Sequence, residues 1–172
     1  MIIREYAERH GLGTFVETGT YLGGTVEAVR GHFRRIYSIE LDQTLHVRAR
    51  AHFTAFSHVT LLQGDSGEVL PELLPRIGEP CLFWLDGHFS GGHTAKGRLA
   101  TPIVAELQAI FAHPVDGHVI LVDDARGFGT LPDYPSLDAL RALVAARAPR
   151  LTFEVSDDII RIQPPHGAAR RS

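Results

Sequence analysis

Short runs of apolar and β-branched residues alternate with longer amphipathic segments from residue 14 to about residue 147. Five of the short runs predict strands, each followed by a polar or glycine-rich turn: Thr14–Glu17, Arg35–Leu41, Val59–Gln63, Cys81–Leu85 and His118–Val122. The amphipathic segments predict five helices: Gly24–Phe33, Gln43–Phe56, Glu68–Ile77, Pro102–Phe111 and Ser136–Ala148. This alternation is typical of βαβ units.

The apolar runs also indicate how the strands are buried. CLFWL and HVILV are almost continuously apolar, as strands are that have helices on both faces of a parallel sheet. The last segment, residues 151–163, reads as two strand-like runs hinged at Asp157 and Asp158, which predicts a β-hairpin. We therefore expect an α/β fold: a single doubly wound, mostly parallel seven-stranded sheet with helices on both faces and a C-terminal antiparallel hairpin. Residues 1–165 should form one domain, and residues 166–172 a disordered tail.

Composition narrows the classes of partner. The chain has 172 residues, of which 44% are hydrophobic and 22% charged, and its net charge is -3. This charge is weak and of the wrong sign for binding nucleic acid through bulk electrostatics, so a small partner is expected. Cys81 is the only cysteine, which suits a reducing compartment, and no stretch approaches the roughly 20 apolar residues of a membrane span. We expect a cytoplasmic protein that binds neither nucleic acid nor membrane.

Polar residues follow the predicted strands, where a doubly wound sheet binds its ligand. The first strand runs into ETGTYLGGT, residues 17–25, whose glycines permit a close backbone approach and whose following helix offers free N–H groups. Glu40 ends the second strand, 21 positions after Gly19, where a carboxylate can accept both hydroxyls of a ribose. This spacing favours nucleoside binding, although a purely structural turn is the alternative for the glycine-rich segment alone.

The same segment argues against a dinucleotide. Three residues separate Gly19 from Gly23, so the G-x-G-x-x-G fingerprint is absent. Glu17 stands two positions before the first glycine, where its charge would repel a pyrophosphate but would suit a cation or an amino group. A nicotinamide-dependent oxidoreductase therefore ranks low.

Four motifs in order carry a resemblance to a known family: ETGTYLGGT, the acid of SIELD, GDS at residues 64–66 and LDGH at residues 85–88. They resemble the successive motifs of class I S-adenosylmethionine-dependent methyltransferases, which have a Rossmann-like fold with an antiparallel seventh strand. The resemblance implies that S-adenosylmethionine is the cofactor. It places the methionine part along the first turn, the ribose at Glu40 and the adenine at Asp65 and Ser66; the residues of that turn are Glu17, Gly19, Thr20, Gly23 and Thr25.

Three acids belong to the acceptor side. Asp86 follows the fourth strand, and Asp123 and Asp124 follow the fifth. If these strands are neighbours, the carboxylates converge, and an all-oxygen site favours Mg²⁺ or another divalent ion. The pattern resembles the metal-dependent O-methyltransferases of the catechol and macrocin types, in which such acids hold the ion. In the alternative interpretation Asp124 pairs with Arg126 and Asp86 only caps its strand.

His88 occupies the position at which the macrocin type has a second acid. With an ordinary pKa near 6.5, it could act as the general base beside Asp86, or it could bind a softer metal. The loop at residues 89–98 adds His93, Lys96 and Arg98, which suit an acceptor bearing phosphate or carboxylate, although a simple lid is an equal alternative.

These observations predict an S-adenosylmethionine-dependent methyltransferase. The expected reaction is metal-assisted O-methylation of a small-molecule or glycosyl hydroxyl. The alternatives are a non-catalytic cofactor-binding scaffold of the same fold and an N-methyltransferase without metal. Only 13 residues precede the first strand, so homodimerisation, the 89–98 loop or the segment Gly127–Pro135 would have to close the site.

Overall fold

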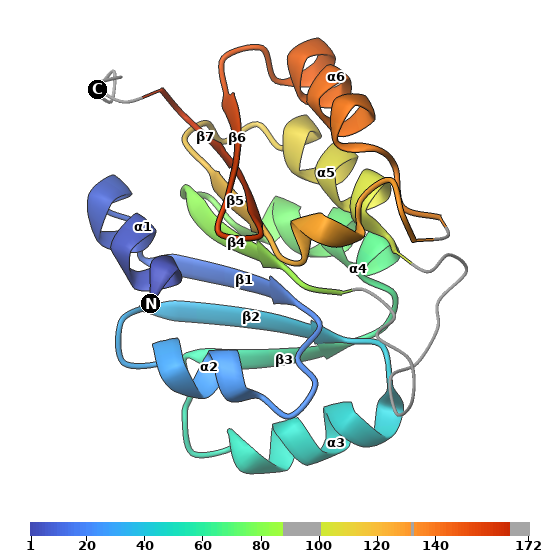
Figure 1. Cartoon of the computed structure of the whole chain (residues 1–172). Coiled ribbons are helices and arrows are strands. Elements are labelled where there is room, and N and C mark those ends of the chain that lie inside the picture. Colours follow the sequence, from blue (N-terminus) through green and yellow to red (C-terminus); the bar gives the residue numbers. More distant parts are fainter. Residues whose placement is uncertain (88–100, 132, 166–172) are drawn as a thin grey trace.

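The computed structural model describes residues 1–87, 101–131 and 133–165, and it contains one seven-stranded sheet (Figure 1). The strands are β1 (Thr14–Thr18), β2 (Arg35–Glu40), β3 (Val59–Gln63), β4 (Cys81–Leu85), β5 (Val119–Val122), β6 (Thr152–Ser156) and β7 (Ile159–Gln163). Their order is β3-β2-β1-β4-β5-β7-β6. The first five are parallel, and β7 lies antiparallel between β5 and β6, which confirms the predicted fold class.

Helices cover both faces of this sheet (Figure 1). The helices are α1 (Ile2–His10), α2 (Gly24–Val29), α3 (Gln43–His52), α4 (Ser66–Leu73), α5 (Ile103–Ala112) and α6 (Leu137–Arg147), with short 3₁₀ turns η1 (Leu74–Arg76) and η2 (Ala125–Gly127). Within the described ranges, no helix has the length and apolar character needed to cross a membrane.

Local capping sets several helix boundaries. Asp42, Asp65 and Ser136 accept hydrogen bonds from backbone N–H groups in the first turns of α3, α4 and α6. Because Asp65 caps α4, the helix begins at Ser66, two residues before the predicted start. It gives way to η1 at Leu74, next to Pro75, which lacks the amide hydrogen that an α-helix requires.

Helix α1 was not among the predicted elements. Its nine residues are rich in charge, yet Ile3, Tyr6 and Ala7 form one buried face against the sheet. Gly11, with φ 60°, ends the helix in the left-handed conformation. The part of the chain before β1 therefore contributes to the core.

The strands alternate between two hydrophobic cores. Phe15 and Trp84 face the core beneath α1 and α2, whereas Val16 and Phe83 face the core beneath α4, α5 and α6. Cys81 is fully buried in the second core, as expected for a core thiol. Because both faces are covered, the carboxyl edge of the parallel strands is left to bind a ligand.

The C-terminal hairpin turns at the predicted residues. Asp157 and Asp158 have φ values of 52° and 64°, the left-handed pair of a two-residue type I′ turn. The backbone carbonyl of Asp158 accepts a hydrogen bond from the N–H of Ala125, just after β5. The hairpin thus lies against the segment that carries the acidic pair.

Candidate functional site

The turn after β1 packs tightly against its neighbours. Gly19 has φ +86°, and a Cβ there would lie 2.4 Å from the carbonyl oxygen of Asp86. Its N–H donates to the carbonyl of Ile39 at 2.9 Å, which ties the turn to β2. Gly23, at φ +80°, caps α2, and a Cβ there would lie 2.7 Å from the Phe53 ring. Both positions therefore require glycine.

Glu17 lies at the centre of a buried polar network. The hydroxyl of Ser38, its paired residue on β2, donates to Glu17 Oε2 at 2.5 Å. Thr20 Oγ1 lies 2.6 Å from Ser38 Oγ, and the Thr25 hydroxyl also bonds the Glu17 carboxyl. These four side chains come from β1, β2, the turn and α2. Three of them, Glu17, Thr20 and Thr25, are predicted cofactor residues, and the structure brings them together.

The charge of Glu17 is poorly stabilised. The side chain is 1% exposed, and burial raises its pKa to about 8 despite the hydroxyls of Ser38 and Thr25, with smaller contributions from Asp86 and Glu40. No lysine or arginine pairs with it in residues 1–87, 101–131 or 133–165. Glu17 is therefore largely protonated at neutral pH, and a nearby cation would ionise it.

Glu40 is held by two backbone amides. Tyr21 N–H donates to Oε2 at 2.7 Å, and Asp42 N–H donates to Oε1 at 2.8 Å. Tyr21, with φ 48°, adopts a left-handed conformation that is unusual for a tyrosine. Each carboxylate oxygen keeps a further acceptor position, so Glu40 has a fixed orientation and can still accept two hydroxyls.

Asp65 follows β3 beside Glu40. The N–H of Gly64 donates to the Glu40 carbonyl, and Asp65 Oδ1 accepts from Gly67 N–H at 2.9 Å. Ser66, the second predicted adenine residue, is buried and donates its hydroxyl to Glu106 Oε1 at 2.6 Å. The Ser66 side chain is thus bonded within the protein, and Glu106 is a site neighbour that the motifs did not indicate.

The three predicted metal ligands follow neighbouring strands but do not form a metal site. Asp123 Oδ1 accepts from the N–H of Asp124, whose carboxylate pairs with Arg126 at 2.5 Å. Asp124 has φ 55°, a left-handed conformation at the entrance of η2. Among the residues described, no group of three or more histidine, cysteine, aspartate or glutamate side chains is arranged to hold a metal ion. The structure does not support the metal prediction. It shows the pairing of Asp124 with Arg126 that the alternative interpretation of the sequence predicts.

Tyr134 is a further residue on this side that the motifs did not indicate. It is 9% exposed and stacks edge-on against Phe128 at 5.2 Å. Burial, together with the charges of Asp124 and Asp86, raises its pKa to about 12. A protonated phenol therefore lies near two of the predicted acceptor-side acids. The only signal in the sequence was its place in the Gly127–Pro135 segment.

The predicted base and acceptor loop lie outside the described residues. His88, His93, Lys96 and Arg98 all fall within residues 88–100, and their roles stay predictions. Asp86, which the sequence also suggests as a catalytic residue, lies within the described residues. Its N–H donates to the Thr18 carbonyl, and its charge contributes to the raised pKa of Glu17. Asp86 therefore lies between the predicted methionine and acceptor sides.

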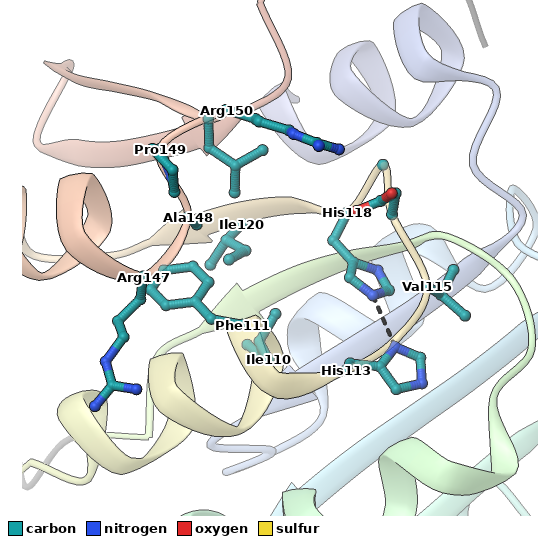
Figure 2. Close-up of a pocket in the computed structure, with 13 residues that line it drawn as sticks. Ile110, Phe111, His113, Val115, His118, Ile120, Arg147, Ala148, Pro149 and Arg150 are labelled. Carbon is teal, nitrogen blue, oxygen red and sulfur yellow. Dashed lines mark hydrogen bonds between the residues drawn. The ribbon is translucent and has the colours of Figure 1, made fainter. Parts of the chain in front are cut away.

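A cavity of about 230 Å³ lies at the amino ends of the strands, between the ends of α5 and α6 and the start of β5 (Figure 2). His113 and His118 line it, with His113 Nδ1 2.9 Å from His118 Nε2. The N–H of Cys81 donates to His118 Nδ1, so a neutral His118 carries its proton on Nε2 and donates it to His113. This cavity is at the amino ends of the strands, opposite Glu17 and Glu40, and so lies away from the predicted cofactor residues.

Comparison with known structures finds proteins of the same fold. No protein-family model matches the chain, and no curated protein matches its sequence. Methyltransferase PaMTH1 of Podospora anserina, solved with S-adenosylhomocysteine, superposes with a TM-score of 0.67 at 20% identity over 95% of this chain and 76% of that one. A candidate O-methyltransferase from Klebsiella pneumoniae gives 0.63 at 16% identity, covering 95% and 77% of the two chains. A candidate rRNA methylase from Clostridium thermocellum gives 0.63 at 14% identity, covering 94% and 95%.

These similarities bear on the fold. At such identities neither a substrate nor an activity can be carried over, and the neighbours include both O-methyltransferases and rRNA methylases. The strand order and the antiparallel β7 agree with the structural match. The chain has the Rossmann-like fold of the class I S-adenosylmethionine-dependent methyltransferases.

Proposed function

We propose that this protein transfers a methyl group from S-adenosylmethionine to a hydroxyl oxygen of a small-molecule or glycosyl acceptor. The observation that carries the proposal is the arrangement at the ends of β1 and β2. There, Glu17 and Glu40 are both buried, both oriented by hydrogen bonds and both next to the glycine turn of a methyltransferase fold. A purely structural turn could use Glu40 through its two backbone amides, but it would not need a buried acid at Glu17.

Glu40 supports the proposal through its fixed geometry. Two backbone amides orient its carboxylate, and the remaining acceptor positions suit the two hydroxyls of a ribose. Asp65, at the end of the neighbouring strand, would bind on the adenine side. The two acids thus follow β2 and β3 in the order in which a nucleoside would lie across the edge.

Glu17 supports the proposal through its charge state. A buried, mostly protonated carboxyl can become ionised when a positive ligand approaches, and S-adenosylmethionine carries both an ammonium and a sulfonium group. The product S-adenosylhomocysteine has lost the sulfonium charge. The network of Ser38, Thr20 and Thr25 keeps this carboxyl in place in both states.

The reaction depends mainly on how the methyl carbon and the acceptor oxygen are positioned. When bound, the cofactor supplies an electrophilic methyl carbon; the acceptor oxygen forms a C–O bond as the C–S bond breaks, and the acceptor proton passes to a base. The protein has to hold the two reacting atoms near ~3 Å apart. Asp86 lies beside the cofactor turn, and Tyr134 lies near it on the acceptor side. His88 is the base that we propose from the sequence, and His93, Lys96 and Arg98 are proposed to contact an anionic acceptor.

Ligand binding by the Glu40→Ala variant tests the cofactor site. Wild-type protein should bind S-adenosylhomocysteine with micromolar affinity in calorimetry, and the ligand should raise its melting temperature. The variant loses two hydrogen bonds to the ribose, which weakens binding by about 2–4 kcal/mol. Glu72→Ala removes an exposed acid on α4 and should leave the affinity unchanged. Equal affinity for the wild type and Glu40→Ala would remove Glu40 from the ribose role.

A transfer assay tests the reaction itself. Protein incubated with ¹³C-methyl S-adenosylmethionine and a panel of phenolic and glycosyl acceptors should label an oxygen, which the chemical shift of the new methyl identifies. Parallel reactions with EDTA and with added Mg²⁺ separate metal-assisted from metal-free transfer. Binding without transfer to any acceptor would favour the non-catalytic scaffold, and labelled nitrogen would favour an N-methyltransferase.

A further inference from the structure

Glu106 is a buried acid on α5 that the proposed reaction does not use. Its side chain is 1% exposed, although its helical neighbours Ile103, Leu107 and Ile110 form an ordinary apolar face against the sheet. Burial raises its pKa to about 7, against the opposing effect of the Ser66 and Thr18 hydroxyls. A leucine would pack there at far lower cost, so the acid must be accounted for by its contacts.

Those contacts join three segments of the site. Ser66 Oγ, at the start of α4, donates to Glu106 Oε1 at 2.6 Å. The Thr18 hydroxyl, at the end of β1, is buried without a hydrogen-bond partner among the described residues, and it lies close enough to the Glu106 carboxyl to lower its pKa. A Cβ on Gly87, just after Asp86, would lie 3.0 Å from Thr18 Oγ1 and 3.4 Å from Glu106 Oε1. The Glu106 carboxyl therefore lies where the end of β1 and the segments after β3 and β4 come together.

The start of α4 also lies close against the start of α5. A Cβ on Gly67 would be 3.1 Å from the Cβ of Ala105 and 3.7 Å from that of Pro102. These apolar contacts bring the two helices together but give the turn before α4 no directional bond. The bond from Ser66 to Glu106 is directional, and it fixes the residue next to Asp65.

We infer that Glu106 is a positioning residue, which holds the Asp65–Ser66 turn in register with the ends of β1 and β4 and so sets the adenine side of the cofactor site. The inference rests on the proposed function, because it assumes that this turn meets adenine. Glu106 acts through Ser66 and does not touch the cofactor. Its loss should therefore affect recognition of the base more than binding of the rest of the ligand.

The experiment compares two ligands: S-adenosylhomocysteine and its inosine analogue, in which oxygen replaces the 6-amino group of the base. Calorimetry measures both affinities for the wild type, Glu106→Ala, Glu106→Gln and Glu72→Ala. Glutamine keeps a carbonyl acceptor for the Ser66 hydroxyl and resembles a protonated carboxyl in shape. Glu72→Ala is the matched control, because it removes an exposed acid from the neighbouring helix.

Glu106→Ala should bind S-adenosylhomocysteine about tenfold more weakly, as expected for one lost hydrogen bond that leaves a buried hydroxyl unpaired. Glu106→Ala should also lose most of the wild-type preference for the adenine ligand over the hypoxanthine ligand, which is the inosine analogue. Glu106→Gln should keep both properties within about twofold, and Glu72→Ala should match the wild type. An equal loss for both ligands would show a purely structural role and overturn the inference, as would a Glu106→Gln variant as weak as Glu106→Ala.

Ser66→Ala covers the case in which Glu106→Ala does not fold. This variant removes only the hydroxyl that donates to Glu106, and it should show the same loss of base preference. Unchanged base preference in Ser66→Ala would overturn the inference while leaving the proposed function intact. Wild-type protein that binds neither ligand would instead overturn the proposed function, and the inference with it.

Discussion

Two glutamates near opposite ends of the same strand have opposite electrostatic environments. Glu79 accepts hydrogen bonds from Thr14, the first residue of β1, and from Arg34 and Arg35 at 3.0 and 2.6 Å. These partners lower its pKa to about 2, with the Thr14 hydrogen bond the largest cause. Glu17, three residues after Thr14, is surrounded by hydroxyls, and its pKa is raised to about 8. The distance between the two environments is that of a single short strand.

His118 is a second polar group at the amino edge whose partners the protein itself supplies. His118, 6% exposed, accepts the N–H of Cys81 and is hydrogen-bonded to His113, so this buried polar group is satisfied in its neutral form. At the carboxyl edge, Glu17 and Glu106 are buried carboxyl groups with raised pKa values, bonded to hydroxyls. Such groups cost folding free energy, which is expected where a ligand is to supply the missing interaction. From this difference we expect the amino ends of the strands to contribute stability and the carboxyl ends to bind the proposed ligand.

The largest effect should come from Glu17→Gln. The folded-state pKa of about 8 lies above the ordinary value of 4.5, so the folded state binds more protons between these limits and stability falls as the pH rises through this window. Glutamine does not titrate, and near pH 8.5 the variant should be more stable than the wild type by about 4 kcal/mol. Near pH 4.5 the two should be nearly equal.

Urea denaturation of ligand-free protein at pH 5 and pH 8.5 measures this difference. Glu72→Gln, on the exposed face of α4, is the control for loss of a carboxylate as such. A Glu17→Gln variant with the same stability gain at both pH values would show that Glu17 is ionised throughout. The contrast between the two edges would then fail.

His118→Asn tests the amino edge in the opposite direction. Burial lowers the pKa of His118 to about 4, with a smaller contribution from His113, whereas the unfolded chain should titrate near 6.5. The unfolded state therefore binds more protons between pH 6.5 and 4, and wild-type stability should fall by about 3 kcal/mol across this window because of His118 alone. Asparagine can still accept the N–H of Cys81 but does not titrate, so its stability should depend less on pH.

Thermal and urea unfolding at several pH values between 7 and 4 provide the measurement. The slope of stability against pH is compared between the wild type and His118→Asn. The substitution removes buried ring volume, so a lower stability of the variant at pH 7 is expected and decides nothing. Parallel curves for the two proteins would mean that His118 is protonated in the folded state.

The positions of the acids proposed for the cofactor site could be predicted from sequence because each comes at or shortly after the end of an apolar run. Glu17 and Glu40 lie at strand ends and Asp65 comes two residues after β3, and the position of a strand end depends on a local pattern. The hairpin at Asp157 and Asp158 was predictable for the same reason, since two adjacent turn-forming residues lie between two strand-like runs.

Other features depend on tertiary packing. Glu106 lies three residues after Ile103 and four before Ile110, so its place on the buried face could have been read from helical spacing; its bond to Ser66, 40 positions away, could not. Asp123 and Asp124 follow β5 as predicted. Asp124 adopts the left-handed conformation, which aspartate accepts more readily than most residues, at the turn into η2, and its carboxylate pairs with Arg126.

The smallest effect should come from Glu79→Gln, because the partners of Glu79 are in solvent. Arg34 and Arg35 are 71% and 55% exposed, and the Glu79 side chain is 24% exposed, so screening reduces the contribution to about 1 kcal/mol near pH 7. Its folded-state pKa of about 2 lies below the ordinary 4.5, so this stability is present above pH 4.5 and is lost as the pH falls toward 2.

Urea denaturation at pH 7 should show the loss of stability of Glu79→Gln in low salt and a smaller loss in 1 M salt, since salt screens exposed charges. Glu27→Gln breaks the pair with Arg30, in which the acid is more exposed than Glu79, and should cost only a few tenths of a kcal/mol. A Glu79→Gln effect no larger than that of Glu27→Gln would mean that the charge of Glu79 adds nothing beyond an ordinary surface ion pair, and the amino edge would owe its stability to His118 and the apolar core.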